Sequence, residues 1–433
     1  MNWPRSPMSS GLRRVCPVSD LLLGVRVVEL ATLLNGSTVG TLLGDLGADV
    51  VKIESPFLGD YIRDISGVVS PHNSPPHIQV NKHKRSLTLN LREERGRELF
   101  WRLHETTDVF VDGNMAGVAN RLGVGYEEQR RRKRGIVYCQ YTGYGAQGPY
   151  ASIPTHGLMM EALAGAHPTV VGADGAARVL VGPPLPPPIQ RDLRSGGEAT
   201  AAGAIHAAFH VAAALVQRDR TGEGAYIDVS AAAAVVANAW IAATFNLNDH
   251  LVIDRADLPD PDAAGPDWVK YQFYAAADGK VVLFACIEHK FWDRFCELVG
   301  RPDLIQHKNA ALPADFAAGD TWLRKQLQEI IVKRDADYWV DLAAREDLPI
   351  GPAPRTISEV ADDPQMRQLG IFHRAPDPTG NDWTYIGEPA RVAGQPYRVQ
   401  RPAPAHGEHT TELLTGLGVT AAELAQLRAA GIV

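Results

Sequence analysis

Three ionisable residues stand at places in this sequence of 433 residues where they could do chemistry. Asp192 and Glu198 flank a glycine-containing turn that leads into an alanine-rich helix predicted over 198–217, and His156 precedes another predicted helix. Proteins use carboxylates as nucleophiles and imidazoles as acid–base groups near neutral pH. Each residue also has a structural interpretation. Glu198 would favour the start of its helix through the helix dipole, and His156 would be a hydrogen-bonded structural histidine.

Residues 143–148, GYGAQG, have the G-x-G-x-x-G spacing of dinucleotide-binding loops. Such a site needs a helix directly after the loop, because the N–H groups at its start hold the pyrophosphate. Pro149 and Pro154 follow instead. We therefore expect neither a nicotinamide nor a flavin site here, and we expect the turn to bring the backbone close to another ligand.

The elements that must position these residues alternate between strands and helices. Valine-rich or alternating stretches predict strands at 24–30, 49–54, 86–91, 108–113, 135–145 and 225–230. Helical spacing predicts helices between them, at 37–48, 92–107, 118–134, 157–165 and 198–217, and another at 231–247. Repeated strand–helix–strand units imply a parallel sheet covered by helices, so the predicted fold class is α/β.

The chain is long enough for two domains. We expect a disordered leader at 1–20, the first part of a large domain at 21–247, and a linker at 248–267 that is rich in Pro and Asp. A small domain at 268–350 would begin with a hairpin around Asp278 and Gly279. Residues 351–433 would return to the large domain.

Composition narrows the classes of partner. The net charge of −7 gives no broad basic surface for nucleic acid; the basic run at 130–134 is short. No apolar stretch has the length and flanks of a membrane span or a secretion signal, so a cytoplasmic protein is expected. The four cysteines, Cys16, Cys139, Cys286 and Cys296, have no CxxC or metal-binding spacing, which predicts reduced thiols and no metal site.

Several longer stretches occur in the order of one known family from about residue 22 to 433. They include GVRVVELATLLNGSTVGTLLGDLGADVVKIE, NKHKRSLTLNLREERGREL, GYGAQGPYA, RDRTGEGAYIDVS and PAPAHGEHTTELLTGLG. Together they resemble the class III CoA-transferases, the group of formyl-CoA transferase, carnitine CoA-transferase and α-methylacyl-CoA racemase. The resemblance implies a Rossmann-like large domain built from both chain ends, a smaller inserted α+β domain, and an interlocked dimer with the active site at the subunit interface.

The resemblance also assigns residues to coenzyme A. They are Leu34, Asn35, Leu89, Asn90, Leu91, Arg92, Asn114 and Arg121. The two arginines would contact phosphate, which suits guanidinium groups, and residues 89–91 would line the adenine. The chain departs from the family at Ser55, where an Arg or Lys is common, and at 112–114, where DGN replaces ENF.

In the family a single aspartate attacks the donor acyl-CoA, and anhydride and enzyme-thioester intermediates follow. An ungapped count back from Thr221 places Thr200 at that position, and threonine cannot form the anhydride. A small shift in the preceding turn places Glu198 there, and Asp192 is a further candidate. The leading hypothesis is CoA transfer between an acyl-CoA and a carboxylic acid with Glu198 as nucleophile.

Two alternatives remain open. His156 matches the base of the racemases in the family, although Gly157 replaces the usual acid beside it, so the chain could instead epimerise an acyl-CoA. It could also be a CoA-binding subunit without a nucleophile of its own. It would then work as a heteromer with a paralogue, whereas the first hypothesis implies a homodimer.

Overall fold

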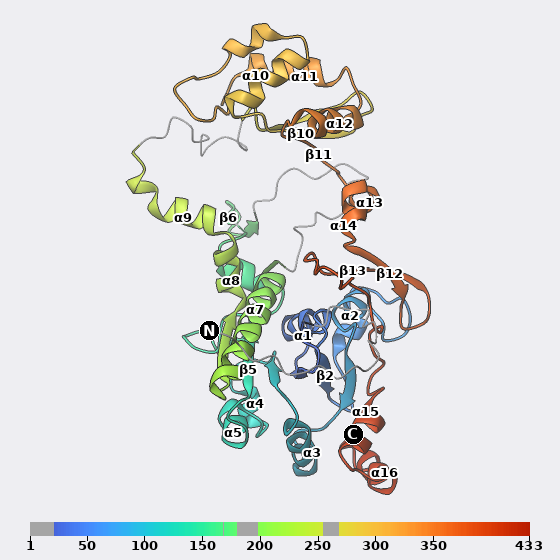
Figure 1. The fold of residues 1–433 in the computed structure, drawn as a ribbon. Coiled ribbons are helices and arrows are strands. Elements are labelled where there is room, and N and C mark those ends of the chain that lie inside the picture. The colour runs from blue at the N-terminus through green and yellow to red at the C-terminus, as the bar shows by residue number, and fades with distance from the viewer. Residues whose placement is uncertain (1–20, 168, 180–197, 254–267) are drawn as a thin grey trace, which may run out of the picture. The chain divides into compact units, whose positions relative to one another are not determined.

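The computed structural model describes residues 21–167, 169–179, 198–253 and 268–433. Its main feature is a six-stranded sheet in the order β3-β2-β1-β4-β5-β8, with every neighbouring pair parallel (Figure 1). The strands are β1 (Arg26–Leu30), β2 (Asp49–Glu54), β3 (Arg85–Thr88), β4 (Val109–Asp112), β5 (Val137–Thr142) and β8 (Ala225–Ser230). All six predicted strands form, and the predicted α/β class is confirmed.

Helices cover both faces of this sheet. They are α1 (Asn35–Asp45), α3 (Glu94–His104), α7 (Glu198–Thr221), α8 (Ala231–Asn238), α15 (Thr410–Gly416) and α16 (Ala421–Ala429). Successive strand residues point to opposite faces. Val27 and Cys139 therefore pack with α1, α7 and α8 in one core cluster, whereas Val28 and Tyr138 pack with α3, α15 and α16 in another.

Two predicted helices are each broken in two. The stretch at 118–134 forms α4 (Val118–Arg121) and α5 (Tyr126–Arg132), because Gly123 between them has a φ of 75°, a conformation that ends a helix. The stretch at 231–247 breaks at Ala239 into α8 and α9 (Trp240–Asn248). No glycine or proline marks this second break, so the sequence carried no signal for it.

The described part of Ile241–Pro364 forms a second compact unit, and Gln365–Val433 returns to the first. The second unit contains a three-stranded sheet in the order β11-β10-β9 with antiparallel pairs, and the hairpin predicted around Asp278 and Gly279 is confirmed. Its elements are η2 (Asp249–Leu251), β9 (Gln272–Ala275), β10 (Val281–Phe284), α10 (His289–Leu298), η3 (Pro302–Gln306), α11 (Thr321–Ile331), α12 (Ala336–Glu346), β11 (Ile350–Pro352) and α13 (Ile357–Asp362). The first residues of the predicted linker, up to Leu251, are helical.

The remaining elements are short and were mostly not predicted. They are η1 (Tyr61–Asp64), α2 (Pro75–Val80), α6 (Leu158–Leu163), β6 (Thr169–Val171), β7 (Ala177–Val179), α14 (Pro364–Leu369), β12 (Phe372–Pro376) and β13 (Asp382–Ile386). Strands β6 and β7 pair with each other, as do β12 and β13. The predicted leader at 1–20 lies outside the described residues.

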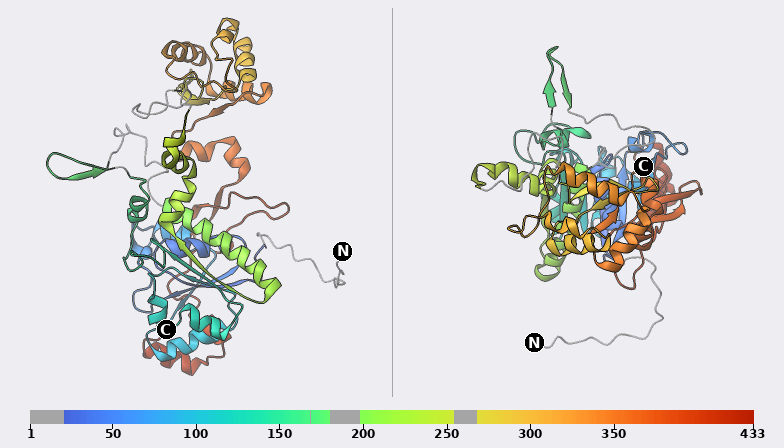
Figure 2. Two further views of the ribbon diagram at one scale, coloured as in Figure 1. Left: turned by 90° about the vertical axis from the view of Figure 1, so that its left-hand side faces the viewer. Right: turned by 90° about the horizontal axis from the view of Figure 1, so that it is seen from above.

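Helix α7 is the longest described helix of the first unit. By length and composition Ala199–Thr221 could cross a membrane, and so could the bent pair of α8 and α9. Half of its most apolar window is buried, and it lies along the sheet against α1, β5 and α8 (Figure 2). We therefore interpret α7 as a core helix of the α/β fold.

Candidate functional site

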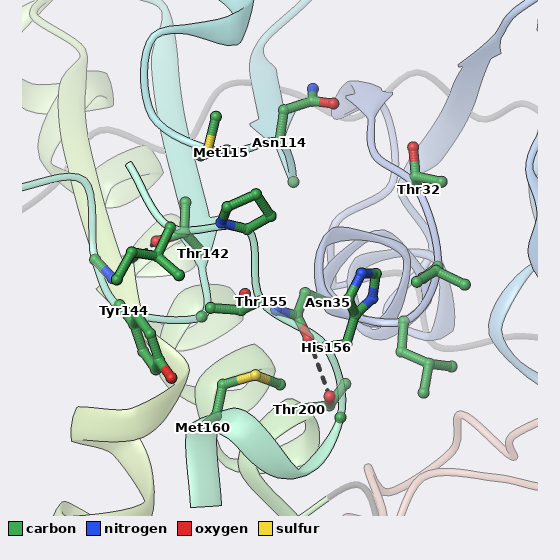
Figure 3. Close-up of a pocket in the computed structure, with 18 of the residues that line it drawn as sticks. Thr32, Asn35, Asn114, Met115, Thr142, Tyr144, Thr155, His156, Met160 and Thr200 are labelled. Atoms are coloured by element: carbon green, nitrogen blue, oxygen red, sulfur yellow. Dashed lines mark hydrogen bonds between the residues drawn. The ribbon is translucent and has the colours of Figure 1, made fainter. Parts of the chain in front are cut away.

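A cavity of about 460 Å³ opens in the first unit where β1, β4 and β5 end. It is lined by residues 32–35 after β1, 113–115 after β4, 142–145 after β5, and parts of 150–161 with Thr200 (Figure 3). In the order β3-β2-β1-β4-β5-β8 the chain winds in opposite directions on the two sides of the β1–β4 pair. Parallel sheets bind ligands outside the carboxyl ends of the strands at this switch point, in pockets of roughly 300–1,000 Å³. The cavity therefore has the place and size of a ligand site.

The turn from β1 into α1 forms one wall of the cavity. Leu33 in this turn has a φ of 62°, a left-handed conformation that is strained for a residue with a branched side chain. Its N–H donates to both carboxylate oxygens of Asp60, at 3.0 and 3.1 Å. The Asp60 carboxylate also accepts the N–H of Ile62 at 3.0 Å. Asp60 thus holds the cavity-facing turn in its unusual conformation.

A buried network of charges lies behind this turn. The ammonium group of Lys52 contacts Glu29 and Asp60, each at 3.0 Å, and Lys84 contacts Glu29 at 2.7 Å. Both lysines also donate to the backbone of the turn and of α1, at Ala31 and Ser37 respectively. Burial works against both ammonium groups. Asp60 and Glu29 nevertheless raise the pKa of Lys52 above its ordinary value, whereas the pKa of Lys84 falls to about 8.

The close approach of α1 to this network requires glycine at position 40. A β-carbon on Gly40 would lie 2.0 Å from a carboxylate oxygen of Glu29. Only a residue without a side chain fits there, since real β-carbons do not approach other atoms so closely. The network thereby determines how closely α1 approaches Glu29, as well as the conformation of the turn before α1.

A second buried cluster continues behind Asp60. Arg63 donates two hydrogen bonds to Glu54, of 3.1 and 2.7 Å, and a third to His77 Nε2 at 3.1 Å. Burial opposes the charge on Glu54, but Arg63 outweighs it and lowers the pKa of Glu54 to about 2. Burial and the charge of Arg63 lower the pKa of His77 to about 3. The imidazole therefore stays neutral in the folded protein.

The wall after β4 is fixed by hydrogen bonds of Asn114. Its Nδ2 donates to the carbonyl of Leu30 and to Asp112 Oδ1, each at 2.9 Å. The hydroxyl of Tyr138 donates to the other oxygen of Asp112 at 2.7 Å. Burial raises the pKa of Asp112. These hydrogen bonds hold the turn at 112–114, and Asn114 lines the cavity.

The turn at 143–148 forms the wall after β5. Residues 143–145 line the cavity, and the N–H of Ala146 donates to the two oxygens of Asp228 at 2.9 and 3.1 Å. Gly145 and Gly148 have φ values of 93° and 94°, which only glycine adopts easily. The expectation that this motif brings backbone to a ligand site remains a prediction, and its contact with the cavity supports it.

Helices α6 and α7 form the floor of the cavity. The hydroxyl of Thr200 donates to Asn35 Oδ1 at 3.0 Å (Figure 3). The backbone N–H of Ala199 donates to Glu161 Oε1 at 3.2 Å. Glu161 is 4% exposed, and its other oxygen, Oε2, has no hydrogen-bond partner among the described residues. A buried carboxylate thus lies against the N-terminus of α7 and lines the cavity.

The structure brings together only some of the predicted site residues. Leu34, Asn35, Asn114 and His156 all line the cavity, and the imidazole of His156 is exposed and makes no side-chain hydrogen bond to the described residues. Glu198 is the first residue of α7, but its side chain is not among the described atoms. Asp192 lies outside the described residues.

The other predicted CoA contacts do not line this cavity. Leu89 and Leu91 are buried in the core beneath α3, and Asn90 donates its N–H to Ile432 at 2.8 Å. Arg92 and Arg121 are exposed, and within the described residues their guanidinium groups have no hydrogen bond or ion pair. Both are available to an anion, and their contact with CoA remains a prediction.

Helix α7 runs unbroken from Glu198 to Thr221. The residues from Thr200 to Thr221, over which the ungapped count was made, all belong to this helix, and Thr200 lines the cavity. The match of Thr200 to the family's nucleophile position stays a prediction. Glu198 lies two residues before Thr200 in the same helix and Asp192 lies before the helix, and the assignment of either as nucleophile stays a prediction.

The sequence analysis missed Glu161, Asp60 and the buried lysines. Glu161 is the single charged residue in the run LMMEALAG, which was a detectable signal because charged side chains are rarely fully buried without a role. Lys52 stands inside a buried strand, DVVKIE, and carried a similar signal. Asp60 lies in a loop and gave none.

The part of the chain that the structure describes also bears on two other kinds of site, a metal site and a cysteine nucleophile. Among the described residues no three His, Cys, Asp or Glu side chains gather as a metal site requires. Cys139 is fully buried, and burial raises the pKa of its thiol to about 12, so it is a core residue rather than a nucleophile.

The model of CoA-transferase family III matches residues 22–410, and the chain belongs to this family of enzymes. The resemblance drawn from the sequence is thereby confirmed, and CoA-transferase activity on CoA thioesters follows from the family. The chain is similar to succinyl-CoA:glutarate CoA-transferase of Homo sapiens, 27% identical over 404 residues that cover 92% of this chain and 87% of that protein. It is also similar to succinyl-CoA:mesaconate CoA-transferase of Haloarcula marismortui, 30% identical over 408 residues that cover 91% and 96%.

Solved structures share the fold. The crystal structure of Rv3272 from M. tuberculosis has a TM-score of 0.69 and 25% identity, and the match covers 92% of this chain and 99% of that one. A CAIB/BAIF family protein from Brucella suis has a TM-score of 0.66 and 27% identity, with coverage of 92% and 99%.

Proposed function

We propose that the enzyme transfers CoA between an acyl-CoA thioester and a carboxylic acid through a carboxylate at the start of α7, with Glu198 as that carboxylate. The observation that carries the proposal is the cavity at the switch point, which gathers Leu34, Asn35, Asn114 and His156 around the start of α7. The relatives named above act on glutarate and mesaconate, so their names do not settle the acyl group of this enzyme.

The chemistry proceeds in balanced steps. The enzyme carboxylate attacks the thioester carbonyl, the C–S bond breaks, and CoA thiolate leaves as an acyl anhydride forms. The thiolate attacks the enzyme carbonyl of the anhydride, which releases the donor acid and leaves an enzyme–CoA thioester. The acceptor carboxylate attacks the carbonyl of that thioester, the C–S bond breaks, and a second anhydride forms as CoA thiolate leaves. The thiolate then attacks the acceptor carbonyl of this anhydride, which forms the acceptor acyl-CoA and releases the free enzyme carboxylate. Covalent catalysis divides one hard exchange into easier steps.

Two groups support this chemistry from the cavity wall. The Oδ1 of Asn35 accepts a hydrogen bond from the hydroxyl of Thr200. The Nδ2 of Asn35 is then available to donate to an acyl oxygen. The dipole of α7 favours negative charge near the start of the helix. Arg92 and Arg121 supply exposed cations for the phosphates of CoA.

The test is to map the labelled peptide after incubation with an acyl-CoA and quenching with borohydride, which reduces an enzyme-bound carboxyl thioester to an alcohol. A reduced Glu198 supports the proposal. A reduced Asp192 moves the nucleophile to the other side of the turn, and the absence of label with demonstrable CoA binding contradicts the transferase mechanism.

Two observations keep the alternatives in view. His156 lines the cavity with a free imidazole, which favours epimerisation at the α-carbon as a second candidate function. Entry of solvent deuterium at that carbon separates the two. Thr200 lines the cavity, and the ungapped count matches it to the nucleophile position of the family, which favours a CoA-binding subunit that needs a paralogue. Recovery of activity on addition of such a paralogue is the test.

We further infer that a second copy of the chain covers α7, as an interlocked dimer requires. Ile205, Phe209 and Val216 lie along one side of the helix and are 58%, 68% and 58% exposed. Burying such a stripe against a second copy would remove apolar surface from water, which favours association. The cytoplasm remains our proposed compartment.

A further inference from the structure

The cavity wall is unusually poor in positive charge for a site that binds acids. Among its described lining residues there is no lysine and no arginine. The nearby cations are used elsewhere: Lys52, Lys84 and Arg63 are buried and bonded to Glu29 and Glu54 behind the turn. A second carboxylate on the substrate would therefore find no cation in this wall.

The charged side chain that does line the cavity is a carboxylate. Glu161 is more than nine-tenths buried, its Oε1 accepts the N–H of Ala199, and its Oε2 has no partner in the part of the chain that the structure describes. A buried oxygen without a hydrogen-bond partner destabilises the folded state, and a hydrogen-bond donor on a ligand would relieve this cost. A carboxylate brought near Oε2 would instead be repelled.

The rest of the wall is mainly neutral and apolar. Leu33, Leu34, Ile65, Met115 and Met160 line the cavity together with Tyr144. Such side chains favour the hydrocarbon part of an acyl group, because burying it removes apolar surface from water.

Resting on the proposed CoA transfer, we propose that the site selects acyl groups without a second carboxylate, and favours those that direct a hydroxyl group to Glu161. Glu161 is in this view a specificity-determining residue. It discriminates by attraction to a donor and by repulsion of a charge, and specific sites commonly combine the two.

The experiment compares three CoA thioesters with acyl chains of four carbons: 3-hydroxybutyryl-CoA, butyryl-CoA and succinyl-CoA. Their dissociation constants are measured by calorimetry, together with the rate of CoA transfer. We expect 3-hydroxybutyryl-CoA to bind about tenfold more tightly than butyryl-CoA, as one added hydrogen bond to a charged group allows. We expect succinyl-CoA to bind at least tenfold more weakly than butyryl-CoA.

The Glu161→Gln variant keeps an oxygen for the N–H of Ala199 and removes the charge. It should bring succinyl-CoA to within about threefold of butyryl-CoA. Glu127→Gln, on the exposed side of α5, is the matched control and should keep the order of the wild type. His156→Gln should also keep it, because the discrimination does not depend on the imidazole.

Binding of succinyl-CoA as tight as that of butyryl-CoA by the wild type overturns the inference, and this result needs no variant to fold. An unchanged ratio in a folded Glu161→Gln variant overturns it as well. If the expected order of binding is found but no thioester supports transfer, the selectivity stands and the proposed function fails.

Discussion

Replacement of Asp60 by Asn tests whether the buried charges hold the cavity wall in place. The substitution preserves the size of the side chain but removes its charge and one of the two oxygens that accept the N–H of Leu33. It also leaves Lys52 and Lys84 with Glu29 as their shared counter-charge, where two carboxylates had balanced two ammonium groups.

The size of the effect follows from this geometry. Removing one partner of a buried ion pair costs about 3–5 kcal/mol. Lys52 keeps its contact with Glu29, so we expect a loss near the lower limit, about 3 kcal/mol of unfolding free energy. The left-handed Leu33 stores about 1–3 kcal/mol of strain, and without Asp60 it should relax. A wall displaced by about 1 Å costs roughly a hundredfold in rate.

Urea unfolding at pH 7 and the rate of CoA transfer measure the two effects. Leu33→Gly, made in both backgrounds, provides the matched comparison, because glycine adopts a φ of 62° without strain. The Asp60→Asn protein that also carries Leu33→Gly should be less impaired than the Asp60→Asn protein that keeps Leu33. An Asp60→Asn protein with unfolding free energy within about 1 kcal/mol of the wild type, and with an unchanged rate, would refute the reasoning.

Three further predictions concern pH, CoA phosphates and assembly. His77 has a pKa of about 3 in the folded protein and about 6.5 when unfolded. Between these pH values the unfolded state binds more protons than the folded state. The free energy of unfolding therefore decreases as the pH falls, by about 2 kcal/mol at pH 5. Urea unfolding at pH 7 and 5 should show this loss in the wild type and a smaller one in His77→Gln, and equal losses would contradict the assignment. Arg92→Ala and Arg121→Ala should each weaken CoA binding about tenfold. The control Arg130→Ala, on the exposed end of α5, should not weaken it. Equal dissociation constants for all three variants in calorimetry would show that Arg92 and Arg121 do not bind CoA. Phe209→Lys should convert the dimer to monomer in light scattering, and a wild type that is already monomeric would refute the covered stripe.

The sequence was most informative where local pattern and tertiary environment agree. The predicted strand at 49–54 matches β2 and that at 225–230 matches β8 residue for residue, because their alternation of valine, isoleucine and charged residues is typical of strands. The hairpin at Asp278 and Gly279 was equally clear. The break at Ala239 was not, since neither glycine nor proline stands there to interrupt the helix.

The candidate site was only partly predictable for a related reason. Asn35 and Asn114 line the cavity and could be identified from the family resemblance, because they follow strand ends that the family shares. The ion pair of Lys84 with Glu29 joins residues 55 positions apart, and no local pattern reveals such a pairing. Glu161 acquires its position only when α6 meets the start of α7.

The arrangement of the two core clusters also affects how the chain is made. The face of the sheet that carries Val28 and Tyr138 is closed by Leu413, Leu414, Leu424 and Leu427 of the last two helices. Synthesis proceeds from the N-terminus and domains fold as units, so every strand of this sheet leaves the ribosome before those leucines exist. Residues Ile241–Pro364 of the second unit are translated after the last strand of this sheet and before those leucines. Until then that face can be only partly covered, and the nascent chain offers an apolar surface to chaperones.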